Sequence, residues 1–238
     1  SAFSWPPPGL TDKSVRPVGT FEPAGIIWPE FLPSAFSGNG AGGISIIWPE
    51  FSPKPPSLEI TGVALKGNKS FGIHLVGSGS VTADHTLVVG TIAGATGAAD
   101  GVRLSALPNG QIAKPSLVLG ADTVVADNGR AGIYISCPGL VTVHGLVASQ
   151  PRGGVWAEGL LAQAHITASA VLSHNTFVGA AASNGGVLEV SGTTVRHTQA
   201  GVVQLSGSGK TDEAKGKTVK FGDGIALLNG ASGSINTA

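Results

Sequence analysis

From Leu58 onward, apolar and polar residues alternate in short runs that glycine interrupts at regular intervals. A glycine followed by a small or β-branched residue recurs at Gly72-Ile73, Gly101-Val102, Gly132-Ile133, Gly154-Val155, Gly179-Ala180, Gly201-Val202 and Gly224-Ile225. Successive glycines of this set are 29, 31, 22, 25, 22 and 23 residues apart. Spacings near 22 predict one coil of three short strands, and the two longer spacings predict coils that carry an extra loop.

Within one such spacing, the alternation restarts about three times. Between Gly132 and Gln150 the apolar positions are Ile133 and Ile135, Val141 and Val143, and Leu146 to Ala148, separated by Pro138-Gly139 and His144-Gly145. Alternation with a period of two is typical of strands with one buried face, and Gly and Pro mark the corners between them. No 3.6-residue period is sustained, so we expect helices to be nearly absent.

These patterns divide the chain into two regions. Residues 57–238 are predicted to form an all-β, right-handed parallel β-helix of about seven coils, each burying its inward residues against the coils above and below. Residues 1–56 contain eleven of the 15 prolines and three of the four tryptophans. Proline restricts φ and removes backbone donors, so this region is predicted to be an extended N-terminal arm or cap.

The predicted arm contains an internal duplication, because the segment Ile26–Phe31 recurs as Ile46–Phe51 with the identical sequence IIWPEF. One interpretation is that two equivalent strands cover the open apolar end of the first coil. The other is that an exposed aromatic segment docks on a partner or on a sugar surface. The aromatic residues concerned are Trp28, Phe31, Trp48 and Phe51.

The coil segments Ala131–Ile135, Gly153–Ala157, Ala200–Leu205 and Asp223–Leu227 share one pattern, and the coil ends Asp127-Asn128, His174-Asn175 and His197-Thr198 place polar residues at tight corners. In these features, over about residues 58–238, the chain resembles the pectate-lyase-like superfamily of right-handed parallel β-helices. That superfamily includes polysaccharide lyases and hydrolases, phage tail spikes, adhesins and bacterial surface lipoproteins. The resemblance therefore implies a fold and not one function.

The residue after each glycine is predicted to point inward and the next one outward, so stacked coils align their outward residues in one column. This column is predicted to contain His74, Arg103, Tyr134, Trp156, a small residue near Ala181, then Gln204 and Ala226. Tyr134 and Trp156 are expected on adjacent coils. Aromatic rings with polar edges beside an arginine form a candidate platform for a sugar ring or a partner's extended chain. The competing interpretation is that the rings only cover the sheet and stabilise each other.

Charge and composition exclude several partners. Fourteen basic and 14 acidic residues cancel without a basic stripe, which argues against nucleic acid. No apolar run approaches 18 residues, so no membrane span is expected. The chain begins at Ser1 and contains no Met, which fits a mature exported protein at the cell surface or outside the cell. The single cysteine, Cys137, is expected to be a small buried apolar residue.

An enzyme on this fold would need carboxylates that converge on one patch. Asp100 and Asp223 share a column but are predicted about five coils apart, on the order of 24 Å. Asp122 and Asp127 are expected at corners as turn formers. Adjacent residues on a strand point to opposite faces, so Asp84 and His85 are also expected to serve the turn.

The six histidines follow no metal-binding spacing, although His174 and His197 are expected to stack on successive coils. No catalytic, metal or cofactor site is therefore predicted. The sequence favours a non-catalytic, secreted or cell-surface protein with a structural, adhesive or glycan-binding role. The alternatives are a polysaccharide lyase or glycoside hydrolase, whose acids would require a different coil register, and a subunit or fragment of a fibre that assembles through its coil ends. The expected partners are polysaccharides or another protein surface.

Overall fold

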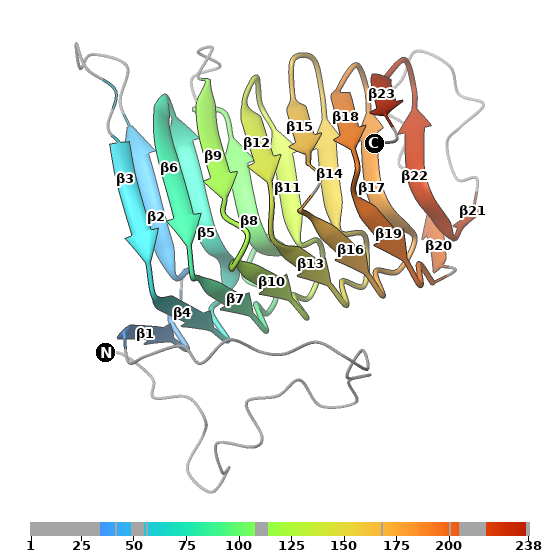
Figure 1. The fold of residues 1–238 in the computed structure, drawn as a ribbon. Coiled ribbons are helices and arrows are strands. Elements are labelled where there is room, and N and C mark those ends of the chain that lie inside the picture. The colour runs from blue at the N-terminus through green and yellow to red at the C-terminus, as the bar shows by residue number, and fades with distance from the viewer. Residues whose placement is uncertain are drawn as a thin grey trace, which may run out of the picture.

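The computed structural model describes residues 34–40, 42–48, 55, 57–107, 114–167, 169–199, 201–204 and 218–236. These residues form strands and turns without any helix, which confirms the all-β prediction. Accordingly, no described segment offers a helix with the length and apolar character that crossing a membrane requires. Three parallel sheets of seven strands each run along a solenoid (Figure 1).

The three sheets take one strand each from every coil. Sheet A consists of β1 (Ser34–Ser37), β4 (Val63–Lys66), β7 (Leu87–Val89), β10 (Val124–Ala126), β13 (Leu146–Ala148), β16 (Val171–Ser173) and β19 (Thr194–Arg196). Sheet B consists of β2 (Ile44–Trp48), β5 (Ser70–Gly77), β8 (Ala99–Ser105), β11 (Ile133–Ser136), β14 (Val155–Glu158), β17 (Val178–Ser183) and β22 (Asp223–Leu228). Sheet C consists of β3 (Ser57–Thr61), β6 (Gly79–Asp84), β9 (Pro115–Leu119), β12 (Leu140–Val143), β15 (Gln163–Ile166), β18 (Val187–Ser191) and β23 (Ser232–Asn236).

Neighbouring strands of a sheet lie one turn apart, so the chain makes about six turns from the first strand of a sheet to its seventh. The predicted count of about seven coils included one that began at Gly201. In the structure, β20 (Gly201–Gln204) instead pairs antiparallel with β21 (Thr218–Phe221), outside the three sheets. Sheet B continues directly from β17 to β22, with Ala180 opposite Ile225. The last turn therefore contains an inserted hairpin, and the Gly201-Val202 pattern of this hairpin resembles that of a coil.

Two strands of the solenoid lie within the predicted arm. In β1, Ala35 pairs with Ala64, and in β2, Ile46 pairs with Leu75, so both strands continue the parallel sheets. The described part of residues 34–48 thus forms the first coil. Trp48 ends β2, but its side chain and all of Trp28, Phe31 and Phe51 lie outside the described residues. Their capping or docking role stays a prediction.

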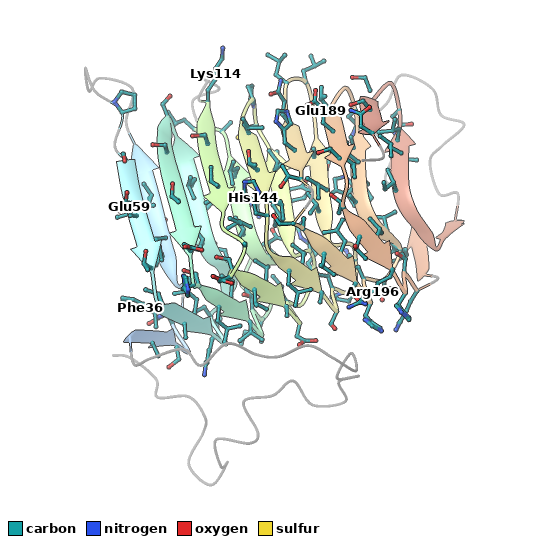
Figure 2. All side chains as sticks on the ribbon, viewed as in Figure 1. Phe36, Glu59, Lys114, His144, Glu189 and Arg196 are labelled. Carbon is teal, nitrogen blue, oxygen red and sulfur yellow. The ribbon has the colours of Figure 1, made fainter. Side chains whose placement is uncertain are left out.

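The core consists of rows of inward residues that run along the axis, while alternate side chains point away from the tube (Figure 2). The row predicted to follow the glycines is present, and its members Ile73, Val102, Ile133, Val155 and Ala180 are fully buried, whereas Ile225 at its end is partly buried. The glycines themselves permit close packing between sheets A and B. A Cβ at Gly132 would lie 2.5 Å from Cγ1 of Val147 and 2.7 Å from the carbonyl oxygen of Gly154. Any side chain there would push the sheets apart, which explains the repeat.

The corner between sheets A and B is built in the same way on every turn. The residue after each sheet-A strand has a positive φ, and the described residues in this position are Gly38, Gly67, Gly90, Asp127, Ser149, His174 and His197. The following residue is often an amide whose side chain bonds to the next coil. The backbone N–H of Asn128 donates to Oε1 of Gln150 at 2.9 Å, and that of Gln150 donates to Oδ1 of Asn175 at 3.2 Å. This ladder satisfies backbone groups that the sheets leave unpaired at the bend.

Cys137 behaves as expected from its apolar surroundings. It is buried and belongs to the central core. Burial raises the pKa of its thiol to about 12, so the group is neutral at physiological pH.

Candidate functional site

The outward column predicted from the sequence is present as a row on sheet B. Register pairs His74 with Arg103, Arg103 with Tyr134, and Tyr134 with Trp156 on four consecutive strands. All four side chains are half-buried, whereas the residue before each of them is buried. Tyr134 and Trp156 are therefore neighbours on adjacent coils, as predicted. Their role in binding stays a prediction.

Gln204 does not belong to this row. It lies at the end of β20, opposite Thr218 of β21, and the row on sheet B passes from Trp156 to Ala181 and then to Ala226. The placement was wrong because Gly201-Val202 repeats the glycine-led pattern of a coil although it begins a hairpin.

A buried ion pair underlies the middle of the row. Asp100 in β8 is completely buried, and it accepts hydrogen bonds from Nε of Arg130 at 2.7 Å and from Nη2 of Arg130 at 2.5 Å. Arg103 approaches the same carboxylate at 3.9 Å. A two-pronged contact fixes the plane of the Arg130 guanidinium, so this group is held rigidly beside the row.

Tyr134 is enclosed by charged groups. The guanidinium carbon of Arg130 lies 4.3 Å from the centre of its ring, and that of Arg103 lies 5.7 Å away. Its hydroxyl donates to Oε2 of Glu158 at 2.5 Å, and Nδ2 of Asn184 donates to Oε1 of the same carboxylate at 3.1 Å. Burial, and then the Glu158 carboxylate, raise the pKa of Tyr134. The phenol is therefore neutral and acts as a hydrogen-bond donor, not as a base.

The two ends of the row differ. Trp156 packs on the apolar cluster around Phe177, and its Nε1 donates to Oγ of Ser183 at 3.0 Å. At the other end, Nε2 of His74 lies 2.7 Å from Oγ of Ser105. Burial, together with the nearby positive charge of Arg103, lowers the pKa of His74 to about 4, so its imidazole is neutral at physiological pH.

Sequence reasoning missed the polar partners of the row, namely Asp100, Arg130, Glu158, Ser183 and Asn184. The partner of Asp100 is Arg130 on the next coil, whereas Asp223 lies four strands away in sheet B. Asp100 and Arg130 are 30 residues apart, which is close to the 31 residues between Gly101 and Gly132. Opposite charges one coil apart were the signal that could have revealed this pair.

The two carboxylates beside the row are both engaged by other side chains. The Asp100 carboxylate is held by arginine, and Glu158 accepts bonds from Tyr134 and Asn184. Two carboxylates free to act as acid and base are therefore not supplied by this network.

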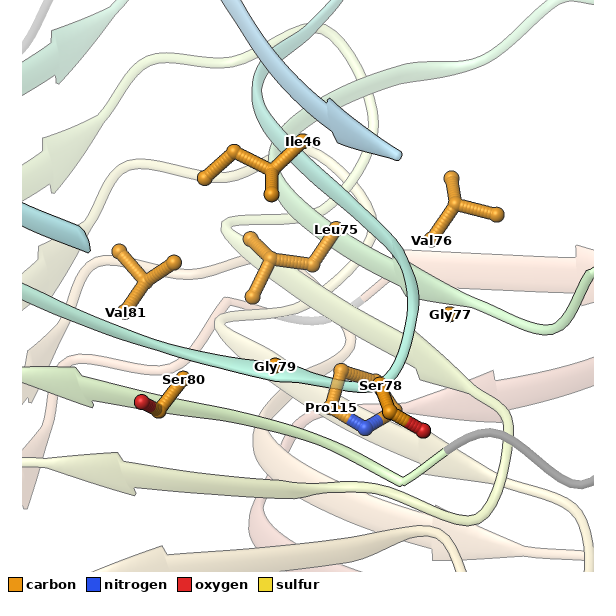
Figure 3. Close-up of a pocket in the computed structure, with 9 residues that line it drawn as sticks. All are labelled: Ile46, Leu75, Val76, Gly77, Ser78, Gly79, Ser80, Val81 and Pro115. Carbon is orange, nitrogen blue, oxygen red and sulfur yellow. The ribbon is translucent and has the colours of Figure 1, made fainter. Parts of the chain in front are cut away.

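A small cavity near the N-terminal end of the solenoid offers no alternative site. It has a volume of about 10 Å³ and is lined mainly by apolar or small residues, including Leu75, Val81 and Pro115 (Figure 3). That volume corresponds to roughly one water molecule. A substrate or cofactor does not fit there.

Comparisons of the chain with protein-family models, with curated proteins and with solved structures find no match in any of the three. The fold and the row on sheet B are thus established from this chain alone, as a parallel β-solenoid with a polar and aromatic strip on one face.

Proposed function

We propose that the protein is a non-catalytic member of the pectate-lyase-like superfamily, located at the cell surface or outside the cell, that binds a carbohydrate chain along sheet B. The observation that carries this proposal is the register of His74, Arg103, Tyr134 and Trp156 on four consecutive strands. Strands in a sheet are about 4.8 Å apart, which is comparable with the length of one sugar residue in an extended chain. Successive sugars would therefore meet successive coils.

The side chains in and beside the row offer the contacts that sugars require. Trp156 presents an aromatic body, and guanidinium, imidazole and carboxylate groups supply donors and acceptors for hydroxyl groups. Tyr134 contributes chiefly by holding Arg130 and Glu158, because guanidinium groups flank its ring. Trp156 is accordingly the main candidate for stacking on a sugar.

Lyase or hydrolase activity is the competing function on this fold. A glycosidase requires two carboxylates, either about 5 to 5.5 Å apart or about 6.5 to 9.5 Å apart, flanking the scissile bond. The engaged state of Asp100 and Glu158 favours binding over cleavage.

The proposal is tested by passing the protein over immobilised neutral and acidic polysaccharides. Retention of the protein and release of reducing or unsaturated ends from the polysaccharide are measured together. We expect retention without cleavage, and at least a tenfold loss of affinity in Trp156→Ala, because stacking contributes about 1 kcal/mol or more beyond area burial. Phe36→Ala is the matched control, since Phe36 is an exposed aromatic residue on sheet A. Release of cleaved ends, or equal loss in both variants, would contradict the proposal.

A further inference from the structure

A second group of polar side chains lies where sheet C turns into sheet A. Asp84 is the last residue of β6, His85 follows it, and Asp122 occupies the same corner one coil later. The sequence predicted that Asp84 and His85 point apart, as neighbours on a strand do. That prediction was wrong, because His85 has a φ of 45° and leaves the strand conformation. The imidazole is consequently directed between the two carboxylates.

The three groups are close enough to share one ion. Nδ1 of His85 lies 3.3 Å from Oδ2 of Asp84, and Nε2 lies 3.2 Å from Oδ2 of Asp122. One ligand atom from each residue lies within 4.8 Å of the others, and this is the one such group of three among the described residues. Gly120 makes the approach possible, because a Cβ there would lie 2.2 Å from Oδ1 of Asp84.

We propose that this corner is a binding site for Zn²⁺ or a similar transition-metal ion, with Nε2 of His85 and the Asp122 carboxylate as direct ligands. Zinc bonds of about 2.0 to 2.2 Å in tetrahedral geometry place two ligand atoms roughly 3.3 to 3.5 Å apart. The separation of 3.2 Å between Nε2 and Oδ2 therefore admits an ion after a small adjustment. His85 and Asp122 are both exposed, so water fills the remaining coordination positions.

Asp84 serves as a positioning residue in this site. A histidine that binds a metal usually donates its other ring N–H to a carboxylate, which fixes the tautomer and raises the basicity of the ligand nitrogen. Asp84 stands at Nδ1 in this way, so that in the metal-bound state Nδ1 carries the proton and Nε2 offers its lone pair to the ion beside Asp122. The nitrogen ligand also sets the preference among metals, because Ca²⁺ and Mg²⁺ favour all-oxygen sites.

The chain contains a natural comparison for this role. Nε2 of His165 lies 3.2 Å from Oε2 of Glu189 on sheet C, the same separation as between His85 and Asp122. The His165–Glu189 pair is not part of a three-group cluster within the described residues. Glu189 is labelled near the C-terminal end of the solenoid (Figure 2). If the carboxylate at Nδ1 matters, the corner binds metal more tightly than this pair.

Calorimetric titration of the full chain with Zn²⁺ tests the proposal. We expect one dominant site that His85→Asn and Asp122→Asn abolish, that Asp84→Asn weakens by about 10- to 100-fold, and that His165→Ala leaves unchanged. Asparagine is used at position 85 because it tolerates the left-handed conformation. Nitrogen NMR of the His85 ring should show metal at Nε2 and a proton at Nδ1, with that proton's exchange accelerated in Asp84→Asn.

Three results would overturn the site: absence of Zn²⁺ binding up to millimolar concentration, binding that survives His85→Asn, or binding that is lost instead in His165→Ala or in the His174→Ala/His197→Ala double variant. Equal competition by Ca²⁺ would overturn the assignment to a transition metal. Thermal unfolding of each variant without metal controls for loss of fold. Because sheet B takes no part, this test is independent of glycan binding.

Discussion

The corner after sheet A and the corner after sheet C turn the chain in similar ways but differ in what they bury. Both use residues with positive φ, such as Asp127 after sheet A and His85 after sheet C. After sheet A, the next side chain is a buried amide that bonds to neighbouring coils, as in Asn128 and Gln150. After sheet C, a buried threonine such as Thr86 bonds only to carbonyl groups, and exposed side chains stand beside it.

The two corners therefore differ in how much their polar side chains stabilise the fold. Replacing a buried amide whose hydrogen bonds are all formed leaves backbone groups without a partner. The exposed residues of the other corner carry little of the fold's stability, because surface ion pairs contribute about 0 to 1 kcal/mol. Exposed polar side chains such as those of His85 and Asp122 therefore lie at the corner after sheet C, where the bend does not depend on them.

The largest effect is expected from Gln150→Leu. Gln150 donates to the carbonyl oxygens of Val125 and Ala148 and accepts from the N–H of Asn128, all within the buried ladder. Gln150→Leu leaves the buried N–H of Asn128 without its acceptor and removes both bonds to carbonyl oxygens, although the carbonyl oxygen of Ala148 still accepts from the N–H of Asp127. We expect the free energy of unfolding to fall by about 3 to 5 kcal/mol. Urea denaturation followed by circular dichroism measures this. Thr193→Val at the other corner removes a bond to Thr167 and should cost about 1 kcal/mol, so equal losses would contradict the contrast.

A smaller, pH-dependent gain is expected from Asp127→Asn. Burial raises the pKa of Asp127 from 3.8 to about 7, so between these values the folded state holds a proton that the unfolded state has lost. Stability contributed by this residue therefore falls as the pH rises through that window. Asparagine keeps the φ of 52° acceptable and carries no charge. We expect a gain of about 1 to 3 kcal/mol at pH 8 and almost none at pH 4. Thermal unfolding of the wild-type chain and of Asp127→Asn at pH 4 and pH 8 measures this gain in stability. A larger gain at pH 4 than at pH 8 would refute the prediction.

The smallest effect is expected from Asp122→Asn in the absence of metal. Its contact with His85 is exposed, so we expect the free energy of unfolding to change by less than about 0.5 kcal/mol. Added Zn²⁺ should then raise the melting temperature of the wild-type chain and not that of the variant. A large destabilisation without metal would show that this corner, too, serves mainly to hold the fold.

The sequence predicted those features that depend on strand periodicity. The row from His74 to Trp156 followed from the glycine spacing, because one coil separates each member from the next. The hairpin that begins at Gly201 could not be distinguished from a coil, since both consist of short alternating strands. The Asp100–Arg130 pair was overlooked because Arg130 lies in a corner, where period-two alternation does not apply.

By itself, the sequence determined the solenoid, the inward aliphatic rows and the order of the outward row on sheet B from His74 to Trp156. These follow from side-chain alternation and from the need for glycine where two sheets approach closely. Only the tertiary structure decided which corner residues meet, as with Asp84, His85 and Asp122. The physical reason is that a residue with positive φ leaves the strand conformation, so the alternation of the neighbouring residues no longer predicts where its side chain points. The stacking of coils then brings this side chain beside residues that lie one coil away along the chain.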